Sequence, residues 1–506
     1  GFDDWPAPAR PGVGWELPLM ASERKAIEAL AVRLRESAHP IGRTQLAVLL
    51  LAQVPADLLK AAVGRLHQML RRDFVGMLPM EVATRILELL PVADIVRSCS
   101  LVSRRWRAVA MQACLWRRLF LRRGWRVDGS RWAFYHSLPR GVSPARVLLG
   151  SSALRVSGAL GSQSSSSSSS PSTTPSSSPS PQLPRMPINW RMLYAEYARL
   201  EANWRLGRCR VDRWEAAHSE SIYCLQFDRL NRLFSGSRDA TVKVWHLADS
   251  PSQITPLATL RGHSGSVLTL QADDAELVTG SSDASVCVWS LLTLGVTHRL
   301  RHPDAVLSLR FNAKWLATAC KDRVVRVWRR DKGYAEVFEL RGHAVAVNAV
   351  HVFGDMAVSA SGDRTLKVWD LERRACVLTL ADHSRGVACL DCDGSYIVSG
   401  SSDRSIRIWS IKARRCERTI LNAHADLVRT LAFDRAMDVI VSGSYDESIK
   451  IWRFSTGALI HKIKNVHTSR IFKLAFDRSR IVSCSHDRSI AVIDFASGLV
   501  HARLLI

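Results

Sequence analysis

This 506-residue chain has no long apolar run, no closely spaced set of cysteines and fewer acidic than basic residues. Its most apolar stretch, LAVLLLAQV, is far shorter than the roughly 20 residues of a membrane-spanning helix. The first residues lack the basic-then-apolar order of a signal peptide. The 11 cysteines are scattered singly, without the even, closely spaced pattern of a disulfide-rich secreted domain. We therefore expect a soluble intracellular protein, cytoplasmic, nuclear or both, with reduced thiols.

The shortage of acid leaves 46 Asp and Glu against 70 Lys and Arg, a formal net charge of +24. Such an excess indicates a partner with negative charge. Nucleic acid, an anionic membrane surface and a phosphorylated or acidic protein all qualify, and composition alone does not choose among them.

A serine- and proline-rich segment, GSQSSSSSSSPSTTPSSSPSPQLP (161–184), divides the chain. It lacks the apolar residues that a core needs, so it is predicted to be a flexible insert. Before it, TQLAVLLLAQVPADLLKAAVGRLHQML and LPMEVATRILELL place apolar residues at helical spacing. In the second stretch Leu78, Val82, Ile86 and Leu90 recur in steps of four on one side of a helix.

After the insert, INWRMLYAEYARLEANWRLG predicts one more helix, with Trp190, Tyr194, Tyr197 and Trp204 on related faces. From His218 onward the chain repeats itself at a fixed period, which is typical of a repeat architecture.

Each of the seven repeats has a histidine, an aspartate 20 to 22 residues later, and a Ser or Thr four residues before that aspartate. In six repeats a tryptophan follows the aspartate by six residues, and Ile493 replaces it in the last. The histidines are His218, His263, His302, His343, His383, His424 and His467. This is the WD-repeat pattern, and it predicts a seven-bladed β-propeller with four strands in each blade.

The four side chains of a repeat can form one hydrogen-bonded chain that joins two loops at the same edge of a blade. They are therefore interpreted as structural. Because the same trio recurs in every repeat, no Ser-His-Asp catalytic site is expected. The one CxxC, Cys389 and Cys392, would point its sulfurs to opposite faces of a strand, which indicates packing. No metal, cofactor or catalytic residue is expected.

Closure of the propeller is left open by the sequence. Either CRVDRWE before His218 or LVHARLLI at the end could supply the last outer strand.

Residues beside the histidine and aspartate loops surround one mouth of the central channel, and basic side chains dominate there. The cations are Arg238, Lys321, Arg364, Arg385, Arg429 and Arg470. Acids in the same loops are Glu220, Asp304 and Asp426. Arginine presents a planar fork that binds a phosphate through two donors, and clusters of this kind read phosphopeptides. The mouth is therefore predicted to bind a phosphorylated peptide.

Nucleic acid is the competing anion, and it calls for a groove for bases or a basic stripe outside the mouth. The densest basic stretch, RRWRAVAMQACLWRRLFLRRGWR (104–126), holds eight arginines and no acid, but it overlaps the helical segment. Its apolar residues fit packing and its charges fit a partner or solvent face, so nucleic acid is the less favoured partner.

RRDFVGMLPMEVATRILELL, followed by CSLVSRRWRAVA and LWRR, resembles an F-box. The matching positions are Leu78, Pro79, Glu81, Ile86, Leu90, Val102, Trp106 and Arg107. Ser103 stands where many members have cysteine. The resemblance implies that this segment binds a Skp-type adaptor and, through it, a cullin–RING ubiquitin ligase.

F-box, linker helix with NWR and WD repeats follow one another in F-box/WD-repeat substrate receptors. Among these the chain is most similar to the β-transducin repeat-containing protein family (β-TrCP, Slimb in flies). SIYCLQFD, GHSGSVLTLQ, AVLSLRFN, SASGDRTLKVW, SGSSDRSIRIW and LVRTLAFD carry the resemblance. In that family the mouth reads a doubly phosphorylated Asp-Ser-Gly motif, as in β-catenin-like and IκB-like degrons.

The resemblance also assigns a role to each mouth residue. The first phosphoserine would be held by Tyr223, Arg238, Ser266 and Ser282, and the second by Arg385, the Gly386 backbone and Ser402. The motif's aspartate would be received by Arg429, Tyr445 and Lys321, while the remaining walls would be Leu307, Asn348, Arg364 and Arg470.

The expected fold is a multidomain α plus all-β chain. Its parts are an N-terminal extension (1–43), a helical segment similar to the family's dimerisation segment (44–70), the F-box (71–125), a variable region with the insert (126–187), a linker helix (188–207) and a seven-bladed WD40 propeller (208–506).

The expected function is that of a non-catalytic substrate receptor in an SCF-type E3 ubiquitin ligase. It would bind phosphorylated degrons, form a homodimer and have no membrane partner. The alternative is a ligase-independent WD-repeat scaffold associated with nucleic acid.

Overall fold

The computed structural model describes residues 78–127, 188–228, 231–247, 254–335 and 337–499. The extension, the dimerisation-like segment and the serine-rich insert lie outside these ranges, so homodimerisation stays a prediction. The chain forms two compact units that divide between Gln112 and Ala113. No helix in the described ranges is both long and apolar enough to span a membrane.

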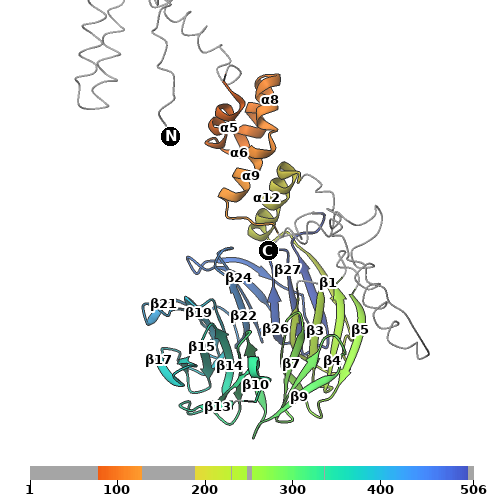
Figure 1. Cartoon of the computed structure of the whole chain (residues 1–506), viewed down its shortest axis with the longest axis vertical. Coiled ribbons are helices and arrows are strands. Elements are labelled where there is room, and N and C mark those ends of the chain that lie inside the picture. Colours follow the sequence, from red (N-terminus) through yellow and green to blue (C-terminus); the bar gives the residue numbers. More distant parts are fainter. Residues whose placement is uncertain (1–77, 128–187, 229–230, 248–253, 336, 500–506) are drawn as a thin grey trace, which may run out of the picture. The chain divides into compact units, whose positions relative to one another are not determined.

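The described part of the first unit is a set of short helices in the F-box-like segment (Figure 1). They are α5 (Met80–Glu88), α6 (Val92–Asp94), a π-helical turn (Ile95–Cys99), α7 (Ser100–Val102) and α8 (Arg104–Ala110). Pro79 and Pro91 occupy the positions just before α5 and α6, where proline costs no helical hydrogen bond. Ser103 caps α8 by accepting a hydrogen bond from the Trp106 N–H at 3.2 Å.

The second unit begins with α9 (Ala113–Arg122), which packs against the linker helix α12 (Trp190–Leu206). Aromatic rings join them: Trp116 lies 5.3 Å from Tyr194, and Phe120 lies 4.7 Å from Tyr197, centroid to centroid. Helix α12 ends at Gly207, whose φ of 63° is the left-handed conformation that favours glycine.

The propeller consists of seven four-stranded antiparallel sheets, as the WD-repeat pattern predicts (Figure 1). Blade 1 is β2 (Ile222–Phe227), β3 (Arg232–Ser237), β4 (Thr241–Leu247) and β5 (Ile254–Arg261). Blade 2 is β6 (Val267–Ala272), β7 (Glu276–Ser281), β8 (Ser285–Ser290) and β9 (Val296–Arg301). Blade 3 is β10 (Val306–Phe311), β11 (Trp315–Cys320), β12 (Val325–Arg329) and β13 (Val337–Leu340), with a 3-10 turn at Arg330–Lys332.

Blade 4 is β14 (Val347–Phe353), β15 (Met356–Ser361), β16 (Thr365–Asp370) and β17 (Ala375–Ala381). Blade 5 is β18 (Val387–Cys392), β19 (Tyr396–Ser401), β20 (Ile406–Ser410) and β21 (Arg415–Ile420). Blade 6 is β22 (Val428–Asp434), β23 (Val439–Ser444), β24 (Ile449–Arg453) and β25 (Leu459–Ile463). Blade 7 is β26 (Ile471–Phe476), β27 (Arg480–Ser485), β28 (Ile490–Asp494) and β1 (Arg210–Trp214).

The first strand of each blade lines the channel, because it contacts the first strands of both neighbouring blades. The hydrophobic clusters fill the gaps between blades: Phe234 and Val244 of blade 1 pack with Leu277 and Trp289 of blade 2. Each sheet therefore buries both faces against its neighbours, which explains why every residue of strands such as β27 is buried.

The segment CRVDRWE supplies the last outer strand of the propeller. Strand β1 pairs with β28, with Arg210 opposite Asp494 and Trp214 opposite Ile490. The propeller ring is thus closed by a sheet that combines its first strand in sequence with its last three.

The expected hydrogen-bonded chain is present in five complete copies, in blades 1, 2, 4, 5 and 6. In blade 5, the His383 ring bonds Asp403 at 2.8 Å and Ser399 at 2.8 Å, and the Trp409 indole N–H donates to Ser399 at 2.8 Å. Blade 7 keeps the bonds of His467 to Asp487 and Ser483 but has Ile493 in place of the indole. The chain ties the histidine loop to the aspartate turn in each of these blades.

Blade 3 departs from the pattern, although its sequence carries all four residues. Arg326 pairs with Asp322 at 2.7 Å and with Glu339 at 2.8 Å, which draws the Asp322 carboxylate away from His302. As a result, His302 Nδ1 is buried without a hydrogen-bond partner among the described residues, although His302 Nε2 keeps its bond to Thr318 at 2.8 Å. Trp328 Nε1 is likewise buried without a described partner. A competing arginine therefore interrupts the network.

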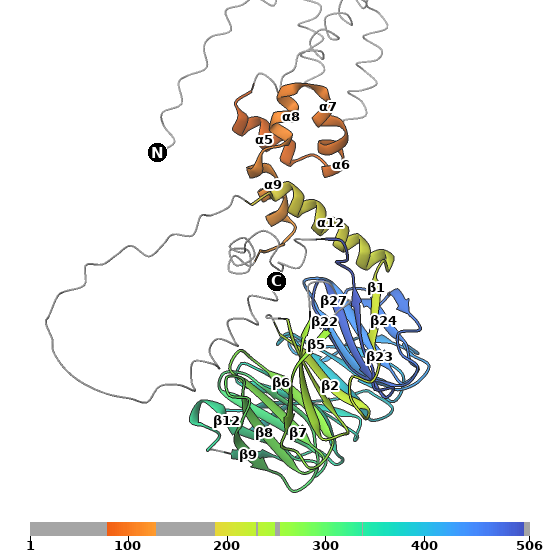
Figure 2. The same ribbon diagram turned by 90° about the vertical axis from the view of Figure 1, so that its right-hand side faces the viewer.

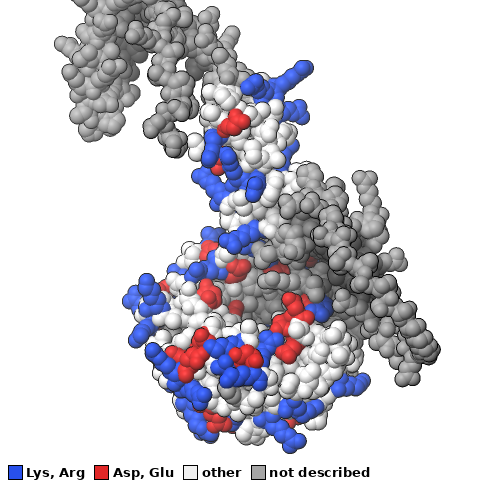
Figure 3. All heavy atoms as spheres, in the orientation of Figure 1, with Lys and Arg blue, Asp and Glu red and all other residues white. Residues whose placement is uncertain are grey.

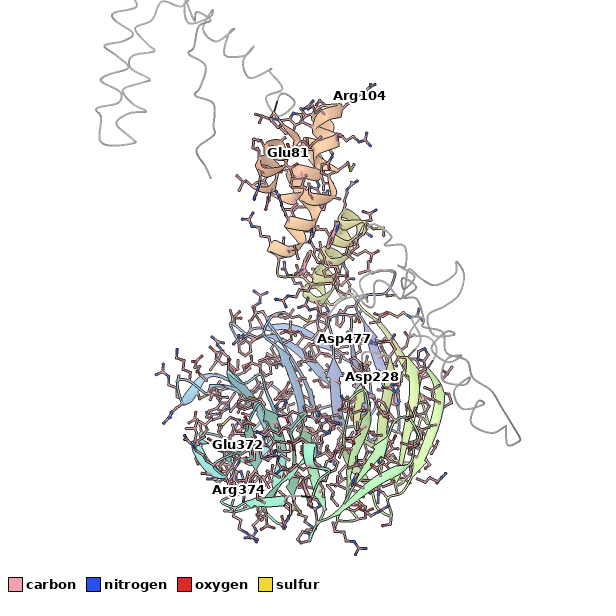
Figure 4. All side chains as sticks on the ribbon, viewed as in Figure 1. Glu81, Arg104, Asp228, Glu372, Arg374 and Asp477 are labelled. Carbon is pink, nitrogen blue, oxygen red and sulfur yellow. The ribbon has the colours of Figure 1, made fainter. Side chains whose placement is uncertain are left out.

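The linker helix meets the propeller at the edge opposite the histidine–aspartate loops (Figure 2). The Trp204 indole stacks on Phe495 at 4.0 Å and donates to the Arg478 carbonyl at 2.8 Å. Arg478 lies in the turn between β26 and β27; Asp228 and Asp477, labelled in Figure 4, lie in turns of this same edge. The channel mouth at the other edge is left free by this helix.

The intact and interrupted networks allow a direct test of the indole hydrogen bond. Trp409→Phe removes the bond to Ser399, whereas Trp328→Phe removes an N–H that has no described partner. We expect Trp409→Phe to lower the free energy of unfolding by at least about 1 kcal/mol more than Trp328→Phe. Urea unfolding of both variants measures the difference, and equal losses would contradict this account.

His302 predicts a specific acid sensitivity. Burial, with the Arg326 charge as the second cause, lowers its pKa from 6.5 to about 4. In the unfolded chain His302 is protonated below about pH 6.5, whereas in the folded chain it stays neutral until about pH 4. The free energy of unfolding therefore falls between these two values as the pH drops. His302→Gln should reduce this fall by on the order of 3 kcal/mol. His298→Gln, at an exposed position, is the control, and unfolding midpoints from pH 7 to 4 are the measurement.

Candidate functional site

Backbone hydrogen bonds position the residues of the mouth. In every blade the residue before the aspartate donates its N–H to a carbonyl in the histidine loop. In blade 1, Arg238 N donates to Ser221 O at 2.9 Å. The same bond brings Ser282 to Ser266 at 2.9 Å and Ser402 to Gly386 at 3.0 Å. Two pairs predicted from the sequence are therefore adjacent in the fold.

The predicted mouth residues differ in depth. The exposed ones, on the loops, are Arg238, Ser282, Lys321, Arg364, Arg385 and Arg470. The half-buried ones, on the inner strands or close to them, are Tyr223, Ser266, Leu307, Asn348, Gly386, Ser402, Arg429 and Tyr445. The mouth thus offers long cations at its rim and, apart from Arg429, shorter polar, apolar or aromatic groups further in.

One wall of the mouth is aromatic. Tyr223 and Tyr445 lie 4.9 Å and 5.8 Å from the Phe472 ring, and the Arg470 guanidinium sits 5.1 Å above Tyr445. His486 lies 6.0 Å from Phe472 on the other side. Phe472 stands five residues after His467 and His486 one residue before Asp487, positions that border the mouth in every repeat. The resemblance gives neither a role, and the structure makes both part of this wall.

The rim cations lack carboxylate partners in the part of the chain that the structure describes. No ion pair or side-chain hydrogen bond joins Arg238, Lys321, Arg364, Arg385 or Arg429 to another described residue. Elsewhere on the propeller arginines are commonly paired, as Arg330 is with Asp273 and Glu276. Of the nearby acids, Asp304 and Asp426 accept hydrogen bonds from the backbone N–H of the next residue. The mouth therefore presents open donors to an anion.

Two predicted residues are constrained in other ways. The Asn348 amide already donates to the Val387 carbonyl at 2.8 Å, so its nitrogen is used between blades. A Cβ on Gly386 would come within 3.1 Å of the Gly362 backbone, so only glycine fits there without a shift. The remaining predicted residues, Arg238, Lys321, Arg364 and Arg385, stand on separate loops.

A second candidate surface lies on the F-box-like helices. Of the predicted adaptor residues, Pro79, Glu81 and Leu90 are exposed and Leu78, Ile86 and Trp106 are half-buried. The buried row of α5 is instead Ala83, Thr84 and Leu87. The apolar row predicted from the four-residue steps therefore faces outward, for the most part.

Two further leucines enlarge this apolar surface, Leu89 with 78% and Leu101 with 80% of its surface exposed. Neither was singled out from the sequence, because Leu101 lies in a short helix without a clear apolar period.

Comparison with known proteins identifies both parts of the chain. The family F-box-like matches residues 75–122. The family WD domain, G-beta repeat matches six segments, 212–246, 254–290, 295–329, 335–370, 374–410 and 414–453. The chain combines an F-box-like segment with WD repeats. The matched segments end before β26, so they leave out β26, β27 and β28 of the blade that has Ile493 in place of tryptophan.

Curated relatives share part of the WD-repeat chain. They include proteins named Mitochondrial division protein 1, from Neurospora crassa (33% identical over 166 residues, 32% of this chain and 24% of the relative) and from Aspergillus niger (34% over 165 residues, 32% and 24%). The one from Mycosarcoma maydis is 30% identical over 187 residues, 33% and 22% of the two chains. This F-box and WD-repeat chain therefore spans about a quarter of the length of these relatives.

Proposed function

We propose that this chain is the substrate receptor of an SCF-type ubiquitin ligase, with the channel mouth as a reader of phosphorylated degrons. The observation that carries the proposal is the set of rim cations without carboxylate partners. An exposed arginine fork on a rigid loop can take a phosphate through two charge-assisted hydrogen bonds at little cost in ordering. The chain performs no bond chemistry itself; it presents a phosphorylated protein to a ubiquitin-loaded partner.

The position of the mouth supports this role. The linker helix attaches at the opposite edge of the propeller, through Trp204 and Asn203, so a bound substrate meets no obstacle from it. Phosphorylation then acts as a switch, because the added negative charge meets donors that are already in place. In the cytosol or nucleus, the proposed compartments, the cysteines would remain thiols.

The resemblance to the β-TrCP family narrows the ligand to a doubly phosphorylated Asp-Ser-Gly motif. Ser266 and Ser282 are adjacent in blade 2, which suits a first phosphoserine held together with Arg238 of blade 1. Gly386 and Ser402 are adjacent in blade 5, beside Arg385, which suits the second. Arg429 and Tyr445, with Lys321, remain for the aspartate that precedes the first phosphoserine.

Binding of a labelled peptide with the doubly phosphorylated motif tests the mouth. Arg238→Ala and Arg385→Ala should each weaken binding by about tenfold to a hundredfold, since each removes charge-assisted hydrogen bonds to a phosphate. Fluorescence anisotropy measures the affinity, with the unphosphorylated peptide as the reference for charge dependence.

The matched control is the double variant Arg414→Ala, Arg415→Ala, which removes two exposed arginines from the outer hairpin between β20 and β21. It should bind like the unaltered protein. Equal weakening by this variant, or binding that ignores the phosphates, would reject the mouth as the phosphate-reading site.

A scaffold outside any ligase is the second candidate, and the likeness to mitochondrial division proteins favours it. That likeness covers about a third of this chain. Basic and acidic side chains intermingle over the propeller face drawn in Figure 3, rather than gathering into a basic stripe, so nucleic acid remains the less favoured partner. Adaptor binding distinguishes the ligase from the scaffold.

Leu101→Ala tests adaptor binding at an exposed position, where loss of folding is not expected. We expect it to weaken association with a Skp-type adaptor about tenfold or more, because it removes one of the most exposed apolar side chains of the F-box-like helices. Leu292→Ala, on the outer hairpin of blade 2 and equally exposed at 80%, is the control. Co-purification and surface plasmon resonance measure binding; an unaltered protein that fails to bind the adaptor would favour the scaffold.

A further inference from the structure

Below the mouth, the channel wall repeats a second pattern. The residues eight places after the blade histidines are Gln226, Gln271, Arg310, His351, Asp391, Ala432 and Ala475. Those six places after them are Cys224, Thr269, Ser308, Ala349, Cys389, Thr430 and Lys473. Because these two positions are i and i+2 in a strand, with one residue between them, they lie on the same face of each inner strand.

Most polar residues at these positions join neighbouring blades. Gln271 exchanges two hydrogen bonds with the Phe311 backbone, at 2.9 and 2.7 Å, and Gln226 does the same with Ala272. Thr430 accepts from the Leu474 N–H at 3.2 Å. In most blades, therefore, the polar residues at these two positions form hydrogen bonds with backbone groups of the next blade.

Arg310 and Lys473 do not follow this rule. The Arg310 guanidinium donates to the carbonyl of its own neighbour Leu309 at 3.3 Å, and it makes no bond to blade 4. The Lys473 ammonium makes no hydrogen bond or ion pair with any described residue. Both line one cavity of about 50 Å³, together with Arg429, which projects from the next position toward the mouth. Three cations thus face one small cavity.

The negative charge near this cavity is too small to balance the three cations. The nearest acid in the channel wall, Asp391, accepts from the Phe433 and Cys392 N–H groups at 3.1 and 3.0 Å. It also lies 3.4 Å from His351 Nε2. One engaged carboxylate therefore stands against three cations. Burial and the neighbouring Arg310 lower the pKa of Lys473 to about 8, as expected where positive charges share a poorly solvated site. An unpaired charge in such a place is costly, and an anion relieves that cost.

We propose that the channel holds a small inorganic anion between Arg310, Lys473 and Arg429, below the mouth. The cavity, of about 50 Å³, has space for a small ion among these side chains. A halide-sized ion fits. The ion neutralises the channel wall, and it lies at the floor of the proposed degron site, because Tyr223, Leu307 and Asn348 line the same cavity.

Other blades of the propeller show which uncharged residues the fold accepts at these two positions. Gln occupies the Arg310 position in blades 1 and 2, and Thr occupies the Lys473 position in blades 2 and 6. The double variant Arg310→Gln, Lys473→Thr therefore removes two cations while installing residues that the same fold accepts there. Arg429 is left unchanged, because it also belongs to the proposed degron site.

Thermal unfolding of the full chain in sodium chloride and in sodium gluconate at equal ionic strength tests the proposal. Chloride should raise the melting temperature of the unaltered protein by about 2 °C or more over gluconate, since it binds the folded state alone. The double variant should lose at least half of this difference and should be no less stable than the unaltered protein in gluconate. Line broadening of ³⁵Cl resonance, displaced by bromide, should likewise fall in the variant.

The charge-matched control is Arg414→Gln, Arg415→Gln, which removes two exposed cations and should keep the full chloride effect. If the double variant fails to fold, Lys473→Thr alone replaces it. A chloride effect that is absent from the unaltered protein, or that persists undiminished in the variant, overturns the proposal.

Discussion

A buried imidazole, held between a carboxylate and a hydroxyl, joins two loops in six of the seven blades. In blade 4 the His343 ring reaches Asp363 at 2.8 Å and Ser359 at 2.7 Å, and the geometry of the other five is nearly the same. The aspartate also accepts from the loop backbone, as Asp363 does from Ala344 N at 3.0 Å. Because these bonds fix both loops, the residues beside them have little freedom to move. The arginines of the mouth are therefore long side chains attached to a rigid loop backbone.

Electrostatic cost changes with depth along the channel. At the rim, Arg238 and Arg385 are exposed, so water solvates them and their lack of carboxylate partners costs little. Deeper in, Lys473 has lost most of this solvation, and its pKa falls to about 8. The same excess of positive charge thus serves two purposes. At the rim it leaves donors open for a phosphate, and in the channel it favours a resident counter-ion.

The repeat spacing was sufficient to predict the propeller, its seven blades and the loops that share an edge, because each repeat carries the same four residues at the same intervals. Closure could not be predicted, since CRVDRWE and LVHARLLI both fit an outer strand and only pairing with β28 decides. The interrupted network of blade 3 was also missed: Asp322 is present, but Arg326 competes for it. Adjacency of Ser266 with Ser282 followed from the repeat, whereas the aromatic wall around Phe472 required knowledge of packing between blades.

The sheet that closes the propeller has a consequence for the order of events during synthesis. Strand β1 leaves the ribosome before any other strand, yet its partner β28 is nearly 280 residues further along the chain. At about 5 to 20 residues per second, β1 therefore waits roughly 15 to 60 s with its backbone groups unpaired. Blades 1 to 6 can each assemble from consecutive segments in that interval. The last blade, and with it the rigid ring that the mouth requires, forms only when the final segment has been made, so a prematurely ended chain would expose an open edge to aggregation or to a chaperone.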